Sequence, residues 1–116
     1  MSARKTTNTT LDQNIYYKMQ LLSIHPELRA EKRHTNRLIE EGMQYVLDHY
    51  QTIFFDSSGK PIKLDFDVKN RKGTNTTLDQ DLYRQISSLA ITLGLNRNDL
   101  IEIGMKHVID KYSNYL

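Results

Sequence analysis

The stretch TNTTLDQ at residues 7–13 occurs again at residues 74–80, 67 positions further along the chain. A second match joins residues 38–50 to residues 100–112, at an offset of 62, through a shared Leu-Ile-Glu, Gly-Met, Val, Asp and Tyr pattern. The first copy therefore carries five more residues between its matched blocks than the second copy. A duplicated unit this short indicates two half-structures related by a pseudo-twofold axis, as in a homodimer fused into one chain.

Length and composition fit one compact domain. The 116 residues are 38% hydrophobic and include no cysteine, which excludes disulfides and thiolate chemistry. No apolar run approaches the roughly 18 residues that a membrane span needs, and the N-terminus has no signal-peptide core. We therefore expect no membrane partner and a cytoplasmic location, which would be the host cytoplasm if the chain is viral.

The positive charges are few but are placed at equivalent sites. A net charge of +2 does not by itself indicate a nucleic-acid partner. Basic clusters lie at Arg4-Lys5, Lys32-Arg33 and residues 69–72, and two of them directly precede the copied Thr/Asn strings. Each cluster alone is typical of a solvated linker, whereas repetition at equivalent sites favours a functional role.

The second copy predicts a strand followed by two helices. Residues 74–78 are short and β-branched, as in a strand, and Asp79 follows as a helix N-cap. Gly94 should end this helix, and Asn96 should cap the next one with Asp99 in a near capping box. The first helix has its apolar stripe at Leu82, Ile86, Leu89 and Leu93.

The first copy follows the same plan, with Asp12 as the cap. Its turn is replaced by residues 25–33, where Pro26 can begin an additional helical turn. The two Thr/Asn strands should pair as an antiparallel ribbon, because a lone strand leaves its amides unpaired. Gly42 and Gly104 lie within the second helices and should mark a close crossing, with accidental retention after duplication as the alternative.

The segment between the copies predicts a β-hairpin. Ile53-Phe54-Phe55, a polar turn with Gly59, and alternating apolar residues at 62, 64, 66 and 68 favour two short strands. The predicted organisation is a first repeat at 1–50, a linker hairpin at 51–71 and a second repeat at 72–116, within one compact domain. The predicted fold class is mainly α with a short antiparallel β-ribbon.

This plan resembles the ribbon-helix-helix superfamily of the Arc and MetJ repressors. Residues 93–101, LGLNRNDLI, are similar to the family's turn pattern Leu-Gly-x-Ser-Arg-Ser-Glu-Leu-Ile. The resemblance covers both repeats and omits the linker. It implies a tandem pseudo-dimer of two fused motifs, as in some archaeal virus regulators and plasmid transfer proteins.

The resemblance also implies which residues face DNA. In this family the ribbon lies in the major groove and alternate strand residues contact the bases. The base-contacting residues would be Thr6, Asn8, Thr10, Gly73, Asn75 and Thr77. Leu11 and Leu78 would point into the core, and Thr7, Thr9, Thr74 and Thr76 would face the helices. Threonine at these inward positions departs from the larger apolar residues of the family, and a shift of one residue would exchange the two faces.

The family binds phosphate at the N-terminus of the second helix, where free amides and the helix dipole favour an anion. With the basic clusters, the phosphate-contacting residues would be Arg4, Lys5, Lys32, Arg33, Thr35, Asn36, Arg71, Lys72, Asn96, Arg97 and Asn98.

Other chemistries have little support in the sequence. The four histidines are scattered without metal-ligand spacing, so no metal site is predicted. Asp65 and Asp67 alternate on an expected exposed strand, as solvated edge residues do. We therefore predict no enzymatic activity, no cofactor and no small-molecule ligand.

The prediction is a sequence-specific double-stranded DNA-binding transcriptional regulator. One alternative is an accessory protein of a relaxosome or partition complex of a mobile element, with the same DNA chemistry at another site. A second alternative is an antitoxin-like interaction module. It is less favoured, because the chain ends four residues after Tyr112 and so offers no long disordered tail to bind a partner protein. Self-association on DNA stays open.

Overall fold

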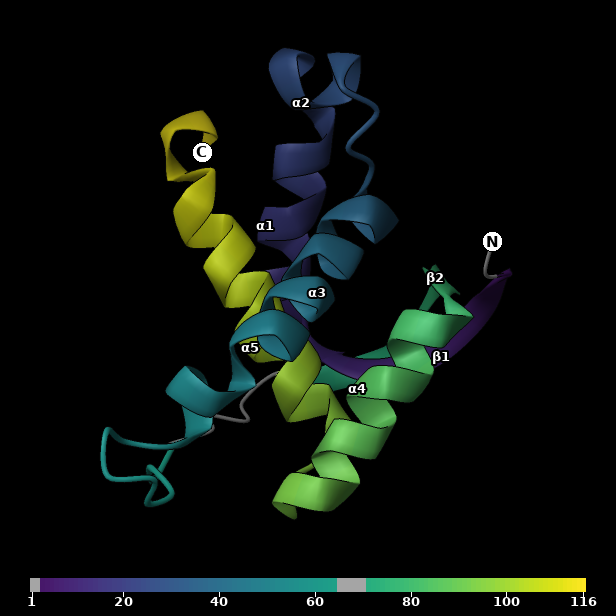
Figure 1. Cartoon of the computed structure of the whole chain (residues 1–116). Helices are drawn as coiled ribbons and strands as arrows, with labels where there is room; N and C mark the ends of the chain where they lie inside the picture. The colour runs from purple at the N-terminus through teal and green to yellow at the C-terminus, as the bar shows by residue number, and fades with distance from the viewer. Residues whose placement is uncertain (1–2, 65–70) are drawn as a thin grey trace.

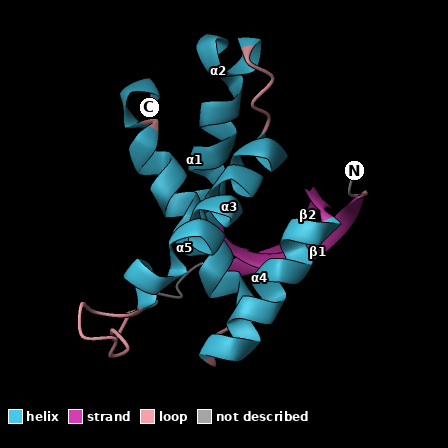
Figure 2. Ribbon diagram, in the orientation of Figure 1, coloured by secondary structure: helices cyan, strands magenta, loops and turns pink. Residues whose placement is uncertain are grey.

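The computed structural model describes residues 3–64 and 71–116. This part of the chain is mainly helical and contains one two-stranded antiparallel sheet, as predicted (Figure 2). Its elements in chain order are β1 (Arg4–Asp12), α1 (Gln13–Ile24), α2 (Pro26–Ala30), α3 (Thr35–Phe54), β2 (Arg71–Asp79), α4 (Gln80–Leu93), α5 (Arg97–Lys111) and the 3-10 turn η1 (Ser113–Tyr115). Figure 1 shows α3 and α5 crossing beside the ribbon that β1 and β2 form.

The ribbon pairs the two copied strings with each other. Asn8 lies opposite Asn75, and threonine lies opposite threonine on both sides of this pair. The pairing therefore follows the sequence repeat, with the Asn8–Asn75 pair at its centre.

Burial alternates along both strands and fixes the two faces of the ribbon. Leu11 and Leu78 are fully buried in the core. The inward threonines are also buried, and these are Thr7, Thr9, Thr74 and Thr76. This confirms the predicted strand register and contradicts the alternative that is shifted by one residue.

Glutamines explain why threonines can occupy the inward face. The Gln80 amide donates to Thr7 Oγ1 and the Gln13 amide donates to Thr74 Oγ1, both at 3.1 Å. Thr7 in turn donates to the Lys5 carbonyl. Buried hydroxyls are tolerated where they are hydrogen-bonded, so Thr7 and Thr74 can occupy positions where apolar residues were expected.

The helix ends follow local sequence signals in most places. Asp12 accepts from the amides of Asn14 and Ile15, and Asp79 does the same one repeat later. Gly94 adopts the left-handed conformation, with φ of 69°, and ends α4. Pro26 begins the short helix α2. These four predictions are confirmed.

The capping box predicted for α5 is wrong. Asn96 occupies the N-cap position, but within the described part of the chain its side chain makes no capping hydrogen bond. The Asp99 carboxylate instead accepts from the Arg71 guanidinium. The Asp99 side chain therefore pairs with a charged residue of β2, Arg71, and does not act in the helix cap that the local pattern predicts.

Gly42 and Gly104 lie against each other where α3 crosses α5. A Cβ built on Gly104 would lie 2.3 Å from the Gly42 carbonyl oxygen, and a Cβ on Gly42 would lie 2.4 Å from the Gly104 carbonyl carbon. About one turn further along each helix, the rings of Tyr45 and His107 stack with centroids 3.5 Å apart. The prediction that the glycines mark a close helix crossing is confirmed.

The linker differs from the predicted hairpin. Helix α3 continues through Phe54, which is buried, so Ile53 and Phe54 are helical rather than extended. The apolar spacing of Val46, Tyr50 and Phe54 extends the α3 stripe, and this helical period prevails over the strand pattern. Within the described part of the linker, Phe55 and Pro61 form a bridge around an Asp56 turn, and residues 65–70, which include the predicted strand residues Asp65 to Val68, lie outside the described residues.

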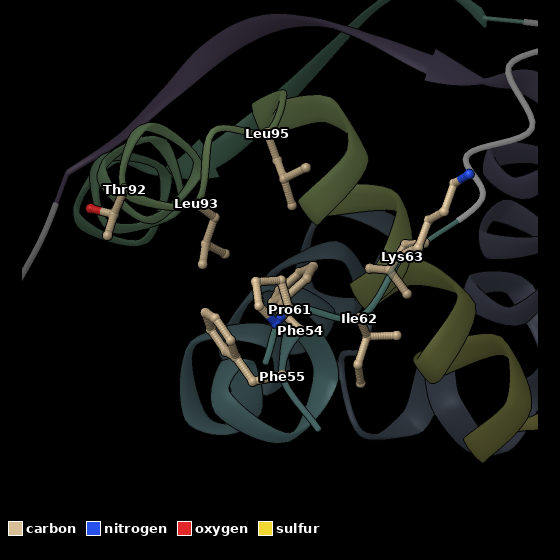
Figure 3. A pocket seen from close by; sticks show the side chains of 9 residues that line it. Phe54, Phe55, Pro61, Ile62, Lys63, Thr92, Leu93 and Leu95 are labelled. Atoms are coloured by element: carbon tan, nitrogen blue, oxygen red, sulfur yellow. The ribbon is translucent and has the colours of Figure 1, made fainter. Parts of the chain in front are cut away.

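The linker packs against the turn between α4 and α5. Between them lies a cavity of about 460 Å³, lined mainly by apolar side chains. Figure 3 shows Leu93 and Leu95 on one side of it and Phe54, Phe55 and Ile62 on the other. In the part of the chain that the structure describes, no helix is long and apolar enough to span a bilayer.

Candidate nucleic-acid interface

The outer face of the ribbon presents an exposed row of small polar side chains. Alternation places on this face the six residues predicted to contact bases, and all six are exposed: Thr6, Asn8, Thr10, Gly73, Asn75 and Thr77. They pair as Thr6 with Thr77, Asn8 with Asn75 and Thr10 with Gly73. The face therefore offers hydroxyl and amide groups, which both donate and accept hydrogen bonds, and carries no charge.

Two lysines lie at opposite ends of the ribbon, one residue beyond the outer-face residues Thr6 and Gly73. Lys5 pairs with Leu78 and Lys72 pairs with Leu11, so each lysine extends beyond the last base-facing pair. Both side chains are exposed. Their positions suit contacts to a polyanion on either side of the ribbon.

Arg4 and Arg71, predicted to contact phosphate, are instead held by carboxylates of the protein. Arg4 binds Glu40 through two nitrogens, at 3.1 and 2.9 Å. Arg71 binds Glu102 in the same manner and also contacts Asp99. The Arg71 side chain is 12% exposed and the Arg4 side chain 32%, and both guanidinium groups are paired with carboxylates of the protein, so the proposed interface does not use them.

The two glutamates also bind the opposite strand. Glu40 Oε2 accepts from the Asp79 amide at 2.8 Å, and Glu102 Oε2 accepts from the Asp12 amide at 2.6 Å. The hydrogen bonds that Arg71 donates to Glu102, and then the one it donates to Asp99, raise the pKa of the Arg71 guanidinium above its usual value. Each glutamate thus fixes one end of the ribbon to the helix beneath it.

Sequence reasoning missed this role of Glu40 and Glu102. The available signal was their place in the copied Leu-Ile-Glu block, where a charged residue interrupts a helix face that is otherwise buried. A buried carboxylate needs a partner, and the copied arginines at equivalent distance from the strings were candidates for it.

The N-terminus of α5 retains an available arginine. The Arg97 guanidinium lies over the Tyr83 ring, 4.5 Å from its centroid. Among the described residues, its Nε is a buried polar atom without a hydrogen-bond partner. Arg97 is one of the residues that line a surface hollow, together with Ser87, Ile91, Leu95, Asn96 and Asn98 among others. The Asn98 side chain is occupied, because it accepts from Thr9 Oγ1 at 2.5 Å.

The N-terminus of α3 is organised differently. Thr35 donates to Ser23 at 3.1 Å, and Asn36 is half-buried. Arg33 pairs with Glu31 and Glu41, so its charge is neutralised by the protein, whereas Lys32 is exposed. The insertion therefore contributes one exposed lysine, and not the paired basic cluster expected from the sequence.

Together these features define the class of the molecule: a two-stranded ribbon with an uncharged, exposed polar face, held over crossing helices by buried ion pairs. Comparison of the chain with protein-family models, with curated proteins and with solved structures found no match. Within residues 3–64 and 71–116, no group of three His, Cys, Asp or Glu side chains is placed to hold a metal ion.

Proposed function

We propose that this protein is a tandem ribbon-helix-helix pseudo-dimer that binds double-stranded DNA sequence-specifically and regulates transcription. One observation carries the proposal. The outer face of the ribbon is exposed, contains only Thr, Asn and Gly, and repeats around the central Asn8–Asn75 pair.

The chemistry of this face suits the major groove. The groove is about 12 Å wide and admits a two-stranded ribbon. An asparagine amide can bond to adenine N6 and N7 together, and a threonine can offer its hydroxyl to a base edge or its methyl to thymine. An uncharged face avoids burying charges against the bases, and the two strands would address two related half-sites.

Positive charge is available where the DNA backbone would lie. Lys5 and Lys72 extend from opposite ends of the ribbon, and Arg97 lies at the N-terminus of α5. Lysine and arginine contacts to phosphate supply most of the sequence-independent affinity, and helix N-termini add amide donors. The proposed phosphate contacts are therefore Lys5, Lys72, Arg97 and Asn96, with Lys32 and Thr35 on the α3 side.

Selection from a pool of random double-stranded DNA tests the proposal. We expect an imperfect palindrome to be enriched. The variant Asn8→Asp/Asn75→Asp should lose this binding, because two carboxylates would face the bases. A matched control, Asn114→Asp, changes the same chemistry in η1 and should bind as the unaltered protein does. Absence of any enriched duplex sequence from a folded protein would contradict the proposal.

The genomic position of the enriched site distinguishes a transcriptional regulator from the alternative, an accessory protein of a relaxosome or partition complex. Occupancy of the protein's own promoter supports a transcriptional regulator. Occupancy of a transfer origin supports the relaxosome accessory role instead.

A further inference from the structure

The two ends of the ribbon differ in ways that the sequence repeat would not predict. We call one the Gly73 end, where Thr10 lies opposite Gly73, and the other the Thr6 end, where Thr6 lies opposite Thr77. The repeat relates Gly73 to Thr6, so at this position a side chain is present in one half and absent in the other.

The missing side chain affects the central pair. A Cβ built on Gly73 would lie 3.4 Å from Asn8 Oδ1, so the Asn8 amide occupies space beside Gly73. At the equivalent place beside Asn75 stands Thr6, with a full side chain. The two asparagines thus have different neighbours, although the repeat makes them equivalent.

The helix N-termini beside the two ends of the ribbon also differ in their side chains. Thr9 binds Asn98 and Arg71 binds Asp99, which places the N-terminus of α5 at the Gly73 end. The Glu40 contacts to Arg4 and Asp79 place the first turns of α3 at the Thr6 end. Arg97 of α5 corresponds in the repeat to Thr35 of α3, which is neutral and donates to Ser23.

We infer that the protein binds an asymmetric DNA site in one orientation, with the Gly73 end always on the same half-site. This inference rests on the proposed function. At the Gly73 end the ribbon has one side chain fewer, so its backbone can approach the base edges more closely. The Arg97 cation lies at the same end and can bind the neighbouring phosphates. At the Thr6 end, threonine side chains on both strands keep the backbone further from the bases. A half-site that suits one end will therefore not suit the other equally.

Directed DNA cleavage measures orientation directly. The chain has no cysteine, so a single introduced cysteine can carry an iron chelate that cleaves nearby DNA. Ile91→Cys and Ile24→Cys form a matched pair, since the repeat relates the two positions. Both side chains are exposed, at 82% and 64%. Ile91 borders the hollow at the start of α5, and Ile24 follows Ser23, which contacts Thr35 at the start of α3.

We expect each labelled protein, bound to its best selected site, to cleave one flank and the two labels to cleave opposite flanks. The ratio of cleavage between the two flanks should be about fivefold or more, because the loss of one base contact changes the affinity of one orientation by at least that factor. The double variant Gly73→Thr/Arg97→Thr makes the two ends alike at both positions, and its ratio should fall to about one.

The outcomes separate the inference from the proposed function. Equal cleavage of both flanks by each label would overturn the single orientation while leaving DNA binding intact. An unchanged ratio in the double variant would overturn the assignment to Gly73 and Arg97. If the folded, labelled protein neither cleaved the DNA nor protected it, the proposed function itself would be overturned.

Discussion

Glu40 and Glu102 each join a strand end to the helix beneath it. Glu102 has 8% of its side chain exposed and accepts both from Arg71 and from the Asp12 amide. Breaking a buried ion pair from one side leaves the other charge without compensation, which is much costlier than losing a surface pair. The ribbon position therefore depends on these two residues.

Glu102→Ala should lower the free energy of unfolding by about 3 kcal/mol, as measured in urea, because Arg71 and the Asp12 amide lose their acceptor. Glu40→Ala should cost less, since the Arg4 side chain is 32% exposed against 12% for Arg71. Asp81→Ala, which breaks an exposed pair with Arg84, is the control and should leave stability nearly unchanged. Equal effects of all three substitutions would refute the structural role of the buried pairs.

Arg97 is the single residue that best distinguishes backbone contact from base contact. Arg97→Ala should weaken binding about equally on all sequences and reduce the salt slope of the binding constant by roughly one. Lys106→Ala also removes one positive charge, from an exposed position further along α5, and should leave the slope unchanged. A change in the preferred sequence with Arg97→Ala would show that the residue contacts bases.

The crossing of α3 and α5 depends on two elements approaching at backbone distance. Gly104→Ala would place a Cβ 2.3 Å from the Gly42 carbonyl oxygen, so the helices must separate. We expect a loss of about 3 kcal/mol or more in the free energy of unfolding, which exceeds the roughly 1 kcal/mol that alanine gains in helix propensity. Thermal unfolding compares this variant with Ser88→Ala on the exposed side of α4. An unchanged or raised melting temperature for Gly104→Ala would contradict the close crossing.

Elements with local signals were predictable from the sequence. Asp12 and Asp79 bond to amides two and three residues away, and Gly94 needs only its own backbone conformation. The two faces of the ribbon followed from the repeat and from the apolar Leu11 and Leu78, and the burial of both leucines confirms them. In each case the interaction lies within one element or within the copied strings.

Features that depend on distant partners were not predictable. The local pattern places Asp99 in a helix cap, whereas its actual partner, Arg71, lies 28 residues away in the chain. The strand pattern includes Phe54, but its apolar spacing fits both periods, and packing in the core decides between them. For the candidate site, the outward face of the ribbon could be predicted from the alternation of residues. The ion pairs that Arg4, Arg33 and Arg71 form with carboxylates of the protein could not, because their partners are distant in the chain or lie outside any local pattern.

The whole molecule contains both strands of the ribbon in one chain. We therefore expect the free protein to have a hydrodynamic mass near the 13.6 kDa of a single chain and to bind DNA at one chain per site. Light scattering with and without a short duplex measures both values. An obligate dimer in which β1 pairs with β1 of a second chain would contradict the intramolecular ribbon.

The central claim is that the outer face of the ribbon contacts DNA bases while its inner face supports the fold. Affinity for the selected site, against random duplex, tests this most directly in two pairs of variants. Asn8→Ala and Asn75→Ala should each cost about 1–3 kcal/mol on the selected site and little on random DNA. Thr9→Ala and Thr76→Ala, on the buried face, should lower the melting temperature and leave sequence preference unchanged. If the threonine variants relaxed specificity and the asparagine variants did not, the assignment of the two faces would be contradicted.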